Sequence, residues 1–385
     1  MTAGANVSTA LHPFAGNTST AGSRLVNDLP GGYWQHDLAD HVLLVNNYFP
    51  PSTLLEELRV ALPKLLGSYP SPHQQIAKQI GELIEQDPNR LVVCNGVAEI
   101  IPVLLRGLGL RIAVPTPSFN PYEYTALPGR LVRFPLSAPS FDLDVDEFAS
   151  FVEKTDVDAA IVISPNNPTS RVVGKEKLVK LATRLGERGK MLLLDESFVE
   201  FADLGHHESL ESDLDALSNV VVLKSLGKIY GSCGLRVGYV LSSNTAFAER
   251  LREFLPIWNV NSLAEFFLSR IGSLRSEAEA SWKQVRADRD NLFGLLSSIP
   301  GMIVIPPHAN FALCRTPDEW PDGPALADAL LERHRILVRH NSGKTMGEGG
   351  RYLRIAARRA ADNQRLVDGL VETAAAIAGR RDEVS

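Results

Sequence analysis

Cysteine, long apolar runs and an excess of positive charge are all scarce or missing in this sequence. The three cysteines, Cys94, Cys233 and Cys314, lie far apart and are odd in number. This excludes a disulfide framework and favours reduced thiols in a cytoplasm. No apolar run approaches about 18 residues, so no membrane span is expected. Residues 1–23 lack a basic start followed by an apolar stretch, so no signal peptide is expected either. With 39 Lys and Arg against 45 Asp and Glu, the net charge is −6, and we do not expect nucleic acid as a partner.

The length and composition indicate a globular protein with more than one domain. The chain has 385 residues, of which 44% are hydrophobic and 22% are charged, so it can bury a large core. At about 150 residues per domain, this length predicts two to three domains. One large α/β domain with a smaller one fits equally well.

Short apolar segments alternate with helix-like segments through the middle of the chain. These segments lie at 91–93, 111–114, 159–163, 191–194 and 220–223. The alternation predicts a mostly parallel sheet covered by helices on both faces. Ligands bind beyond the carboxyl ends of the strands in such sheets. We therefore expect a pocket formed by the residues that follow these strands, at 95–96, 115–119, 166–167, 195 and 224–228.

The pattern changes after about residue 255. Helical stretches at 263–274 and 277–296 precede short apolar segments at 302–305, 310–313, 336–339 and 352–356. This predicts a smaller α+β domain. We therefore divide the chain into an N-terminal arm that is part of the small domain (1–45), a large domain (46–255) and a small C-terminal domain (256–385).

The segment 224–239 holds the strongest chemical signal. Lys228 follows a predicted strand in a Gly-rich turn, and Arg236 lies eight residues further on. A desolvated Lys beside other cations loses its proton readily and can form a Schiff base. The planar guanidinium of Arg236 suits a phosphate. A lone Lys in such a turn is more often part of a solvated loop, so the interpretation depends on the residues around it.

Other positions that follow predicted strands have both a structural and a functional interpretation. Asp195 ends a buried strand, where a carboxylate needs a cation such as a protonated pyridine nitrogen, although Asp also favours helix N-caps. Asn167 is either part of a turn or a donor to a cofactor oxygen. Gly96 and Val97 open a helix whose backbone N–H groups suit a phosphate. Phe119 is either a core residue or a platform that stacks on an aromatic ring.

In chain order, these motifs resemble the fold-type-I pyridoxal 5'-phosphate (PLP) enzymes of the class I/II aminotransferase family. The shared motifs are Asn-Gly-x-x-Glu at 95–99, Pro-Ser-Phe at 117–119, Pro-Asn-Asn-Pro-Thr at 165–169, Asp-Glu-Ser-Phe at 195–198, Ser-x-x-Lys at 225–228, Gly-x-Arg at 234–236 and Leu-Arg-Ile-Ala at 353–356. The nearest branches are histidinol-phosphate aminotransferase and threonine-phosphate decarboxylase, and the likeness covers residues 44–370. The resemblance implies the PLP-dependent transferase fold type I, an α/β fold in which the large domain binds the cofactor.

The resemblance also implies roles around the cofactor ring. Lys228 would bind PLP as a Schiff base and carry a proton during the reaction. Asp195 would pair with the pyridinium nitrogen, Asn167 would donate to the O3' oxygen, and Phe119 would stack on the ring.

The same resemblance implies further roles for the cofactor phosphate and the substrate, a small amino acid. Arg236 and the amides near Gly96 and Val97 would hold the phosphate. Tyr69 would reach across a dimer interface to the partner's cofactor phosphate, which implies a homodimer with shared active sites. Arg354 would clamp the α-carboxylate of the substrate in bidentate fashion.

Several positions depart from the aminotransferase pattern. Three residues after Asp195, most members have a Tyr that donates to O3', whereas this chain has Phe198. Gly227 stands where a Ser or Thr commonly precedes the Lys, and Ser170 stands where a Gly is usual. Phe198 and Arg358 resemble the decarboxylase branch, in which Arg358 would contact the substrate.

Two activities stay open on this basis. The first is a PLP-dependent aminotransferase for an amino acid or a phosphorylated amino compound, and the alternative is a decarboxylase of an O-phospho-amino acid. Arg339, His340 and Arg358 would bind a second substrate anion or be ordinary surface charges. A non-catalytic PLP-fold regulator is a remote third reading, because residues 1–40 contain no helix-turn-helix pattern. No metal site is expected, because the chain has no His-Glu-x-x-His motif.

Overall fold

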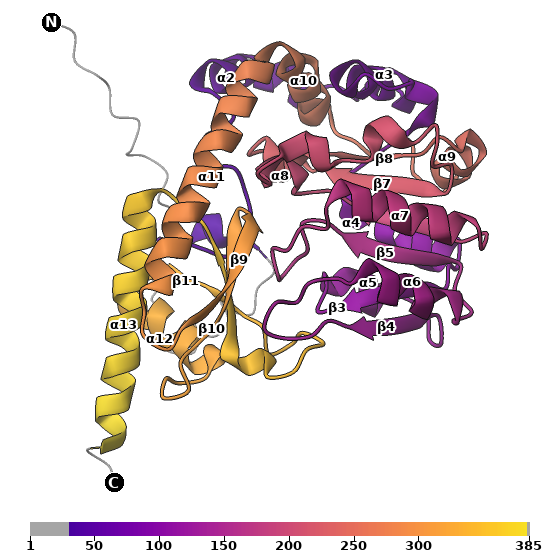
Figure 1. The fold of residues 1–385 in the computed structure, drawn as a ribbon. Helices are drawn as coiled ribbons and strands as arrows, with labels where there is room; N and C mark the ends of the chain where they lie inside the picture. Colours follow the sequence, from indigo (N-terminus) through magenta and orange to yellow (C-terminus); the bar gives the residue numbers. More distant parts are fainter. Residues whose placement is uncertain (1–30, 383–385) are drawn as a thin grey trace, which may run out of the picture.

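The largest feature of the computed structural model, which describes residues 31–382, is a seven-stranded sheet (Figure 1). The strands follow the order β2-β8-β7-β6-β5-β3-β4. Their bounds are β2 Leu91–Cys94, β3 Ile112–Thr116, β4 Leu131–Pro135, β5 Ala159–Ile163, β6 Met191–Asp195, β7 Val220–Ser225 and β8 Gly238–Leu241. Four neighbouring pairs are parallel, and β8 runs antiparallel to both β2 and β7. The prediction of a mostly parallel sheet is therefore confirmed.

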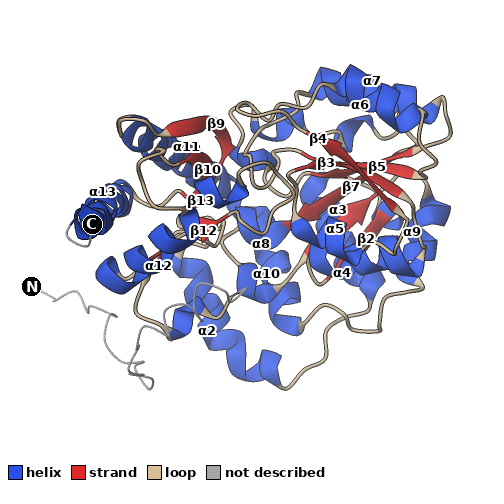
Figure 2. Ribbon diagram, turned by 90° about the horizontal axis from the view of Figure 1, so that it is seen from below, coloured by secondary structure: helices blue, strands red, loops and turns tan. Residues whose placement is uncertain are grey.

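Helices cover both faces of this sheet (Figure 2) because alternate strand residues point to opposite sides. In β6, Leu192 and Leu194 pack on one face and Leu193 packs on the other. The first face is covered by α3 (His73–Ile84), α6 (Val145–Glu153), α7 (Lys175–Gly186) and α10 (Ser262–Ile271). The second is covered by α4 (Val97–Pro102), α5 (Asn120–Thr125) and α9 (Thr245–Arg252). Burial on both faces explains why the strands are continuous apolar runs.

Two strands of the large sheet have no clear sequence signal. β4 is an edge strand with Arg133 at its centre and no fully buried residue, so its apolar pattern is weak. β8 is buried along its whole length but has only four residues and begins at Gly238. It also follows the Gly-rich turn at 231–234, which the sequence indicates as a loop.

A second, antiparallel sheet lies on the left of Figure 1 and has the strand order β12-β13-β10-β9. Its strands are β9 (Ile303–Ala309), β10 (Phe311–Arg315), β12 (Arg339–His340) and β13 (Tyr352–Ala356). Strands β9, β10 and β13 share a core with the helices α11 (Arg275–Ser297), α12 (Gly323–His334) and α13 (Ala360–Asp382). The strand expected at 336–339 is interrupted at Val338. Its first half, β11 (Ile336–Leu337), instead pairs in parallel with β1 (Ala39–Asp40).

The β1–β11 pairing joins the N-terminal segment to the region of the small sheet. Of the predicted N-terminal arm, residues 1–30 lie outside the described part, and the domain boundaries at 45/46 and 255/256 stay a prediction. Helix α2 (Ser52–Leu66) follows this segment and has a single buried residue, Leu54. No helix within residues 31–382 has both the length and the apolar character that a membrane span requires.

Candidate active site

The carboxyl ends of the parallel strands meet at a cavity of about 180 Å³. Strands β2, β3, β5 and β6 end here, and β8 begins here because it runs in the opposite direction. Six of the predicted site residues line the cavity: Val97, Phe119, Asn167, Asp195, Lys228 and Arg236. The expectation that residues following the strands form a common pocket therefore agrees with the structure.

Asp195 is a buried carboxylate with two hydrogen-bond donors. Its side chain is 5% exposed. The hydroxyl of Tyr122 donates to Oδ2 over 2.9 Å, and the backbone N–H of Ser197 donates to Oδ1 over 3.0 Å. Donors of this kind hold a buried carboxylate in a fixed position. Tyr122, on α5, was missed by the sequence reasoning because nothing local links it to a residue 73 positions away.

Lys228 lies on α8 (Leu226–Ile229), a single turn that directly follows β7. Burial lowers the pKa of Lys228, and the carboxylate of Asp195 opposes this effect. Its Nζ lies 4.8 Å from the centre of the Phe198 ring, and that ring packs against Phe311 at 5.3 Å between centroids. Apolar rings therefore lie on one side of the amine. The fraction of Lys228 in the neutral form is larger than it would be in water.

Gly96 and Arg236 approach each other at the mouth of the cavity. A β-carbon at Gly96, where φ is +73°, would lie 2.9 Å from Nη2 of Arg236. Only glycine accepts that backbone angle at no cost and leaves the guanidinium in place. The exposed Arg236 side chain donates to the carbonyl of Cys233 over 3.2 Å. This arrangement leaves a positively charged cradle next to the start of α4.

The structure gives reasons for two departures from the family pattern. A β-carbon at Gly227 would lie 2.9 Å from the Cα of Cys233, so Ser or Thr does not fit there. Ser170 is fully buried with φ of +60°. Its hydroxyl accepts hydrogen bonds from the N–H groups of His308 (3.1 Å) and Ala309 (2.8 Å), which ties the loop after β5 to β9.

Arg354, on β13 of the small sheet, reaches Asn167, a residue of the cavity lining. Its Nη1 donates to the Asn167 amide oxygen over 2.9 Å, and its Nη2 donates to the carbonyl of Val42 over 2.7 Å. The Nε is buried and has no partner among the described residues. Burial lowers the pKa of Arg354 to about 10, with a further contribution from Arg339. An anion that entered here would satisfy the Nε and replace the amide oxygen as acceptor.

Two more cations lie near Arg354. Arg339 pairs with it across β12 and β13 and donates to the hydroxyl of Tyr33 over 2.7 Å. Lys344, in the loop after β12, donates from Nζ to the carbonyl of Ser118. Burial, Arg354 and Arg339 lower the pKa of Lys344 to about 7. No local pattern points to Lys344, which is 226 positions from its hydrogen-bond partner.

Gly96, Arg339 and Arg354, described above, lie outside the lining of this cavity, and so do three further predicted residues. Tyr69 is 78% exposed and stacks on Trp258 at 4.4 Å between ring centroids. Arg358 donates to the carbonyls of Asp40 (2.6 Å) and Leu43 (2.8 Å), so it holds the N-terminal segment. His340 shares a hydrogen bond with Ser342 over 2.8 Å. The roles predicted for these three residues stay predictions.

The residues of the cavity form a donor set that fits PLP. A buried carboxylate suits a protonated ring nitrogen, a lysine amine suits an aldehyde, and a guanidinium beside a glycine cradle suits a phosphate. The amide nitrogen of Asn167 has no partner among the described residues, because only its oxygen is engaged by Arg354. It can donate to a ring oxygen. Within residues 31–382, no cluster of His, Cys, Asp and Glu is arranged to hold a metal ion.

Comparison with known proteins agrees with this geometry. The model of the family described as aminotransferase class I and II matches residues 43–370. The chain belongs to this family. A crystal structure of the histidinol-phosphate aminotransferase from Clostridium acetobutylicum is 26% identical, with a TM-score of 0.78, and the match covers 86% of this chain and 98% of that one. The fold-type-I architecture that the sequence predicts is thereby confirmed.

Two relatives of this chain have names that describe different reactions. The CMP-5'-(3-aminopropyl)phosphonate synthase of Streptomyces rubellomurinus is 40% identical over 352 residues, which are 91% of this chain and 55% of that protein. The L-serine phosphate decarboxylase of Sulfurospirillum multivorans is 30% identical over 319 residues, which are 80% of each chain. Two relatives match this chain over 93% and 91% of its length. The chain spans only 58% and 55% of the length of those two proteins.

Proposed function

We propose that this protein is a PLP-dependent decarboxylase for an amino acid that carries a second anion, a phosphate or a phosphonate. The observation that carries this proposal is the apolar wall beside Lys228. Phe198 stands where a Tyr would donate to the cofactor, and its ring packs on Phe311. The guanidinium of Arg354 lies 5.9 Å from the centre of the same Phe311 ring. A substrate carboxylate between Lys228 and Arg354 would therefore lie against hydrocarbon and lose its water, which favours the loss of CO₂.

The residues that would hold the cofactor are those of the cavity. Lys228 would bind its aldehyde carbon covalently, Asp195 would keep the ring nitrogen protonated, Asn167 would donate to the ring oxygen, Phe119 would cover the ring, and Arg236 would hold the phosphate with the backbone at Gly96 and Val97. When bound, PLP supplies an acceptor for the electron pair released at the substrate α-carbon.

The protein side chains would then orient the substrate and handle its protons. Arg354 would bind one substrate anion through its fork and hold it against the Phe311 ring. Lys228, whose pKa is lowered by burial, would be free to give a proton to the α-carbon and take one back. Phe198 would exclude water from the side of the amine.

The second substrate anion would bind to the cations beside Arg354. Arg339 and Lys344 come from different segments. Besides burial, the charges of Arg354 and Arg339 lower the pKa of Lys344, and the charge of Arg339 lowers that of Arg354. A dianionic group would offset this concentration of positive charge. The names of two relatives support such a substrate, since one acts on L-serine phosphate and the other makes an aminoalkyl phosphonate.

Transamination is the second candidate, and the family membership together with the histidinol-phosphate aminotransferase relatives favours it. Both reactions use the same lysine and the same carboxylate clamp. They differ in which bond at the α-carbon is broken, and therefore in where the clamp holds the carboxylate.

One incubation distinguishes the two activities. The holoenzyme is mixed with O-phospho-L-serine, and CO₂, amine and keto acid are measured together with the visible spectrum. Decarboxylation releases CO₂ and amine in equal amounts and leaves the cofactor absorbance unchanged. A keto acid, with loss of the cofactor absorbance in the absence of an amino acceptor, would instead establish transamination.

We also propose a homodimer in which Tyr69 contributes to the partner's site. Trp258, which stacks on Tyr69, is exposed, and further exposed apolar side chains lie on α2 and in the segment 254–258: Leu55, Val60, Leu66 and Ile257. Exposed apolar side chains of this kind support a protein interface. Light scattering should give the mass of a dimer, and Tyr69→Phe should weaken PLP binding. A monomer with full activity would contradict the proposal.

A further inference from the structure

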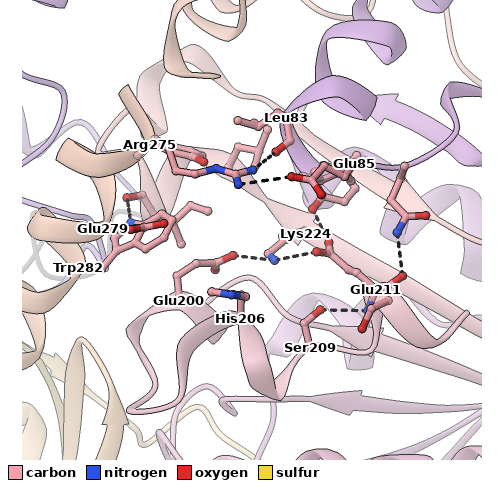
Figure 3. A pocket seen from close by; sticks show the side chains of 17 residues that line it. Leu83, Glu85, Glu200, His206, Ser209, Glu211, Lys224, Arg275, Glu279 and Trp282 are labelled. Atoms are coloured by element: carbon pink, nitrogen blue, oxygen red, sulfur yellow. Dashed lines mark hydrogen bonds and ion pairs between the residues drawn. The ribbon is translucent and has the colours of Figure 1, made fainter. Parts of the chain in front are cut away.

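A second cavity, of about 380 Å³, is seen from close by in Figure 3. It lies against α8, the helix that carries Lys228. Its walls are the end of α3, the segment 206–212, the strands β7 and β8, and the first turns of α11. Leu226 and Ile229, on either side of Lys228, belong to its lining. No residue that lines it also lines the candidate active site. The volume falls in the range of roughly 300–1,000 Å³ typical of small-molecule sites.

In this cavity, two carboxyl groups lie against one buried ammonium group. Lys224 is 3% exposed and lies 2.6 Å from Glu200 and 3.5 Å from Glu211, as Figure 3 shows. The hydroxyl of Tyr239 also donates to Glu211. Two carboxylates therefore share one ammonium group, and a second positive charge would complete the set.

The other charged groups do not supply this second positive charge. Arg275 points to the carbonyl of Leu83 (2.9 Å) and to Glu85 (3.5 Å), which balances its charge. Glu279, on the first turns of α11, also lines the cavity and adds a negative charge.

One buried polar atom in the lining, Oε2 of Glu200, has no hydrogen-bond partner among the described residues, and Glu200 is 5% exposed. Tyr230, a residue that is 7% exposed, also lines the cavity, and its hydroxyl makes no hydrogen bond within residues 31–382. Burial raises the pKa of Tyr230, and the charge of Glu200 adds to this effect. Buried polar atoms left in this state are costly, and a ligand that donates to them is stabilised.

An aromatic corner forms another wall of the cavity. The rings of Tyr230 and Trp282 lie 5.9 Å apart at an interplanar angle of 58°. The indole N–H of Trp282 donates to the carbonyl of Ile229 over 2.9 Å, which fixes the orientation of the ring. Ring faces attract cations, and they also pack against hydrocarbon groups.

We propose that this cavity is a binding site for a small organic ammonium ion. The N–H of the ligand would donate to Glu200 and to the hydroxyl oxygen of Tyr230, and its carbon atoms would lie against Trp282. A metal ion does not fit, because the described residues offer no cluster of metal ligands. An anion does not fit either, because Lys224 and Arg275 already have carboxylate partners.

Three probes of one shape test the charge preference. They are N,N-dimethylethanolamine, which is protonated near neutral pH, its uncharged carbon analogue 3-methylbutan-1-ol, and the anion 3-methylbutanoate. The amine is tertiary and cannot condense with the cofactor aldehyde, so a signal does not depend on the proposed catalytic function. Calorimetry with the full-length holoenzyme should detect the amine and neither of the other two. Equal binding of the alcohol, or tighter binding of the anion, would overturn the proposal.

Variants locate the binding. Tyr230→Phe removes a hydroxyl that bonds to no described residue, so the fold should be kept while the amine binds about tenfold more weakly. Glu200→Gln should weaken binding by at least as much, and Glu332→Gln, at an exposed position on α12, should have no effect. If Glu200→Gln does not fold, Tyr230→Phe alone decides. Unchanged affinity in a folded Tyr230→Phe variant would refute the site.

Discussion

Lys344 provides a test of the second-anion site, because its charge state changes within the working pH range. Burial and the charges of Arg354 and Arg339 lower its pKa to about 7, whereas an exposed lysine titrates near 10.4. If only the protonated side chain binds the substrate phosphate, the competent fraction of the enzyme falls as the pH rises through 7. Lys344→Met removes the charge and keeps most of the side-chain length.

The size of the effect follows from this pKa value. Half of Lys344 is protonated at pH 7, so kcat/KM at pH 7 should be about half of its low-pH value. At pH 8 it should be about one tenth of that value. Lys344→Met should remove this pH dependence and lower kcat/KM at pH 7 by about tenfold or more, the loss of one charge-assisted hydrogen bond. Lys344→Arg stays charged and should remove the pH dependence without the loss.

The assay is the initial rate with O-phospho-L-serine between pH 6.5 and 8.5, expressed as the ratio of variant to wild type so that the titration of Lys228 cancels. Lys177→Met, at an exposed position on α7, is the matched control and should follow the wild type. An unchanged pH profile in Lys344→Met would refute the assignment of Lys344 to the substrate site.

Three stability measurements test the packing described above. Gly227→Ser should lower the free energy of unfolding by about 1–3 kcal/mol, because its β-carbon would approach a backbone atom to 2.9 Å, whereas Gly234→Ser, with nothing within 4 Å, should not; equal midpoints in denaturant would contradict this. Lys224→Met should lower the free energy of unfolding by about 3–5 kcal/mol, because it leaves the buried carboxylate of Glu200 and the partly buried carboxylate of Glu211 without a cation. The exposed Lys78→Met is the control. His41 is 1% exposed and burial lowers its pKa to about 4. As the pH falls, the unfolded state therefore binds a proton at this residue before the folded state does. The folded protein should lose up to about 3 kcal/mol as the pH falls from 6.5 through 4, and His41→Gln should remove that part of the acid dependence measured by thermal or urea unfolding.

Much of the fold could be predicted because the central strands are buried on both faces. Residues 159–163 form a continuous apolar run in the sequence and are the strand β5 in the structure. The position of the pocket also followed, since parallel strands end at one edge of the sheet. β4 was missed because an edge strand needs fewer apolar residues, and β8 because it is short and begins at a glycine.

The contacts that complete the site could not be predicted from local patterns. Tyr122 reaches Asp195 across 73 positions, and Lys344 reaches the carbonyl of Ser118 across 226. Only the folded chain brings such residues together. Gly227 was visible as a departure from the family pattern, but its cause, the backbone at Cys233, was not.

The ionic cluster around Lys224 was likewise hidden in the sequence. Its carboxylates come from the segment after β6, at Glu200, and from a later turn, at Glu211. In the sequence both resemble surface residues, since Glu is rarely buried without a partner.

The central claim is that Lys228 holds PLP, and covalent mapping of the cofactor tests it most directly. The purified protein is loaded with PLP, treated with borohydride and digested, and the modified lysine is located by mass spectrometry. We predict a single reduced cofactor adduct on the peptide that contains Lys228, and none in Lys228→Ala. A protein that takes up no PLP, or an adduct on another lysine that persists in the variant, would contradict the account.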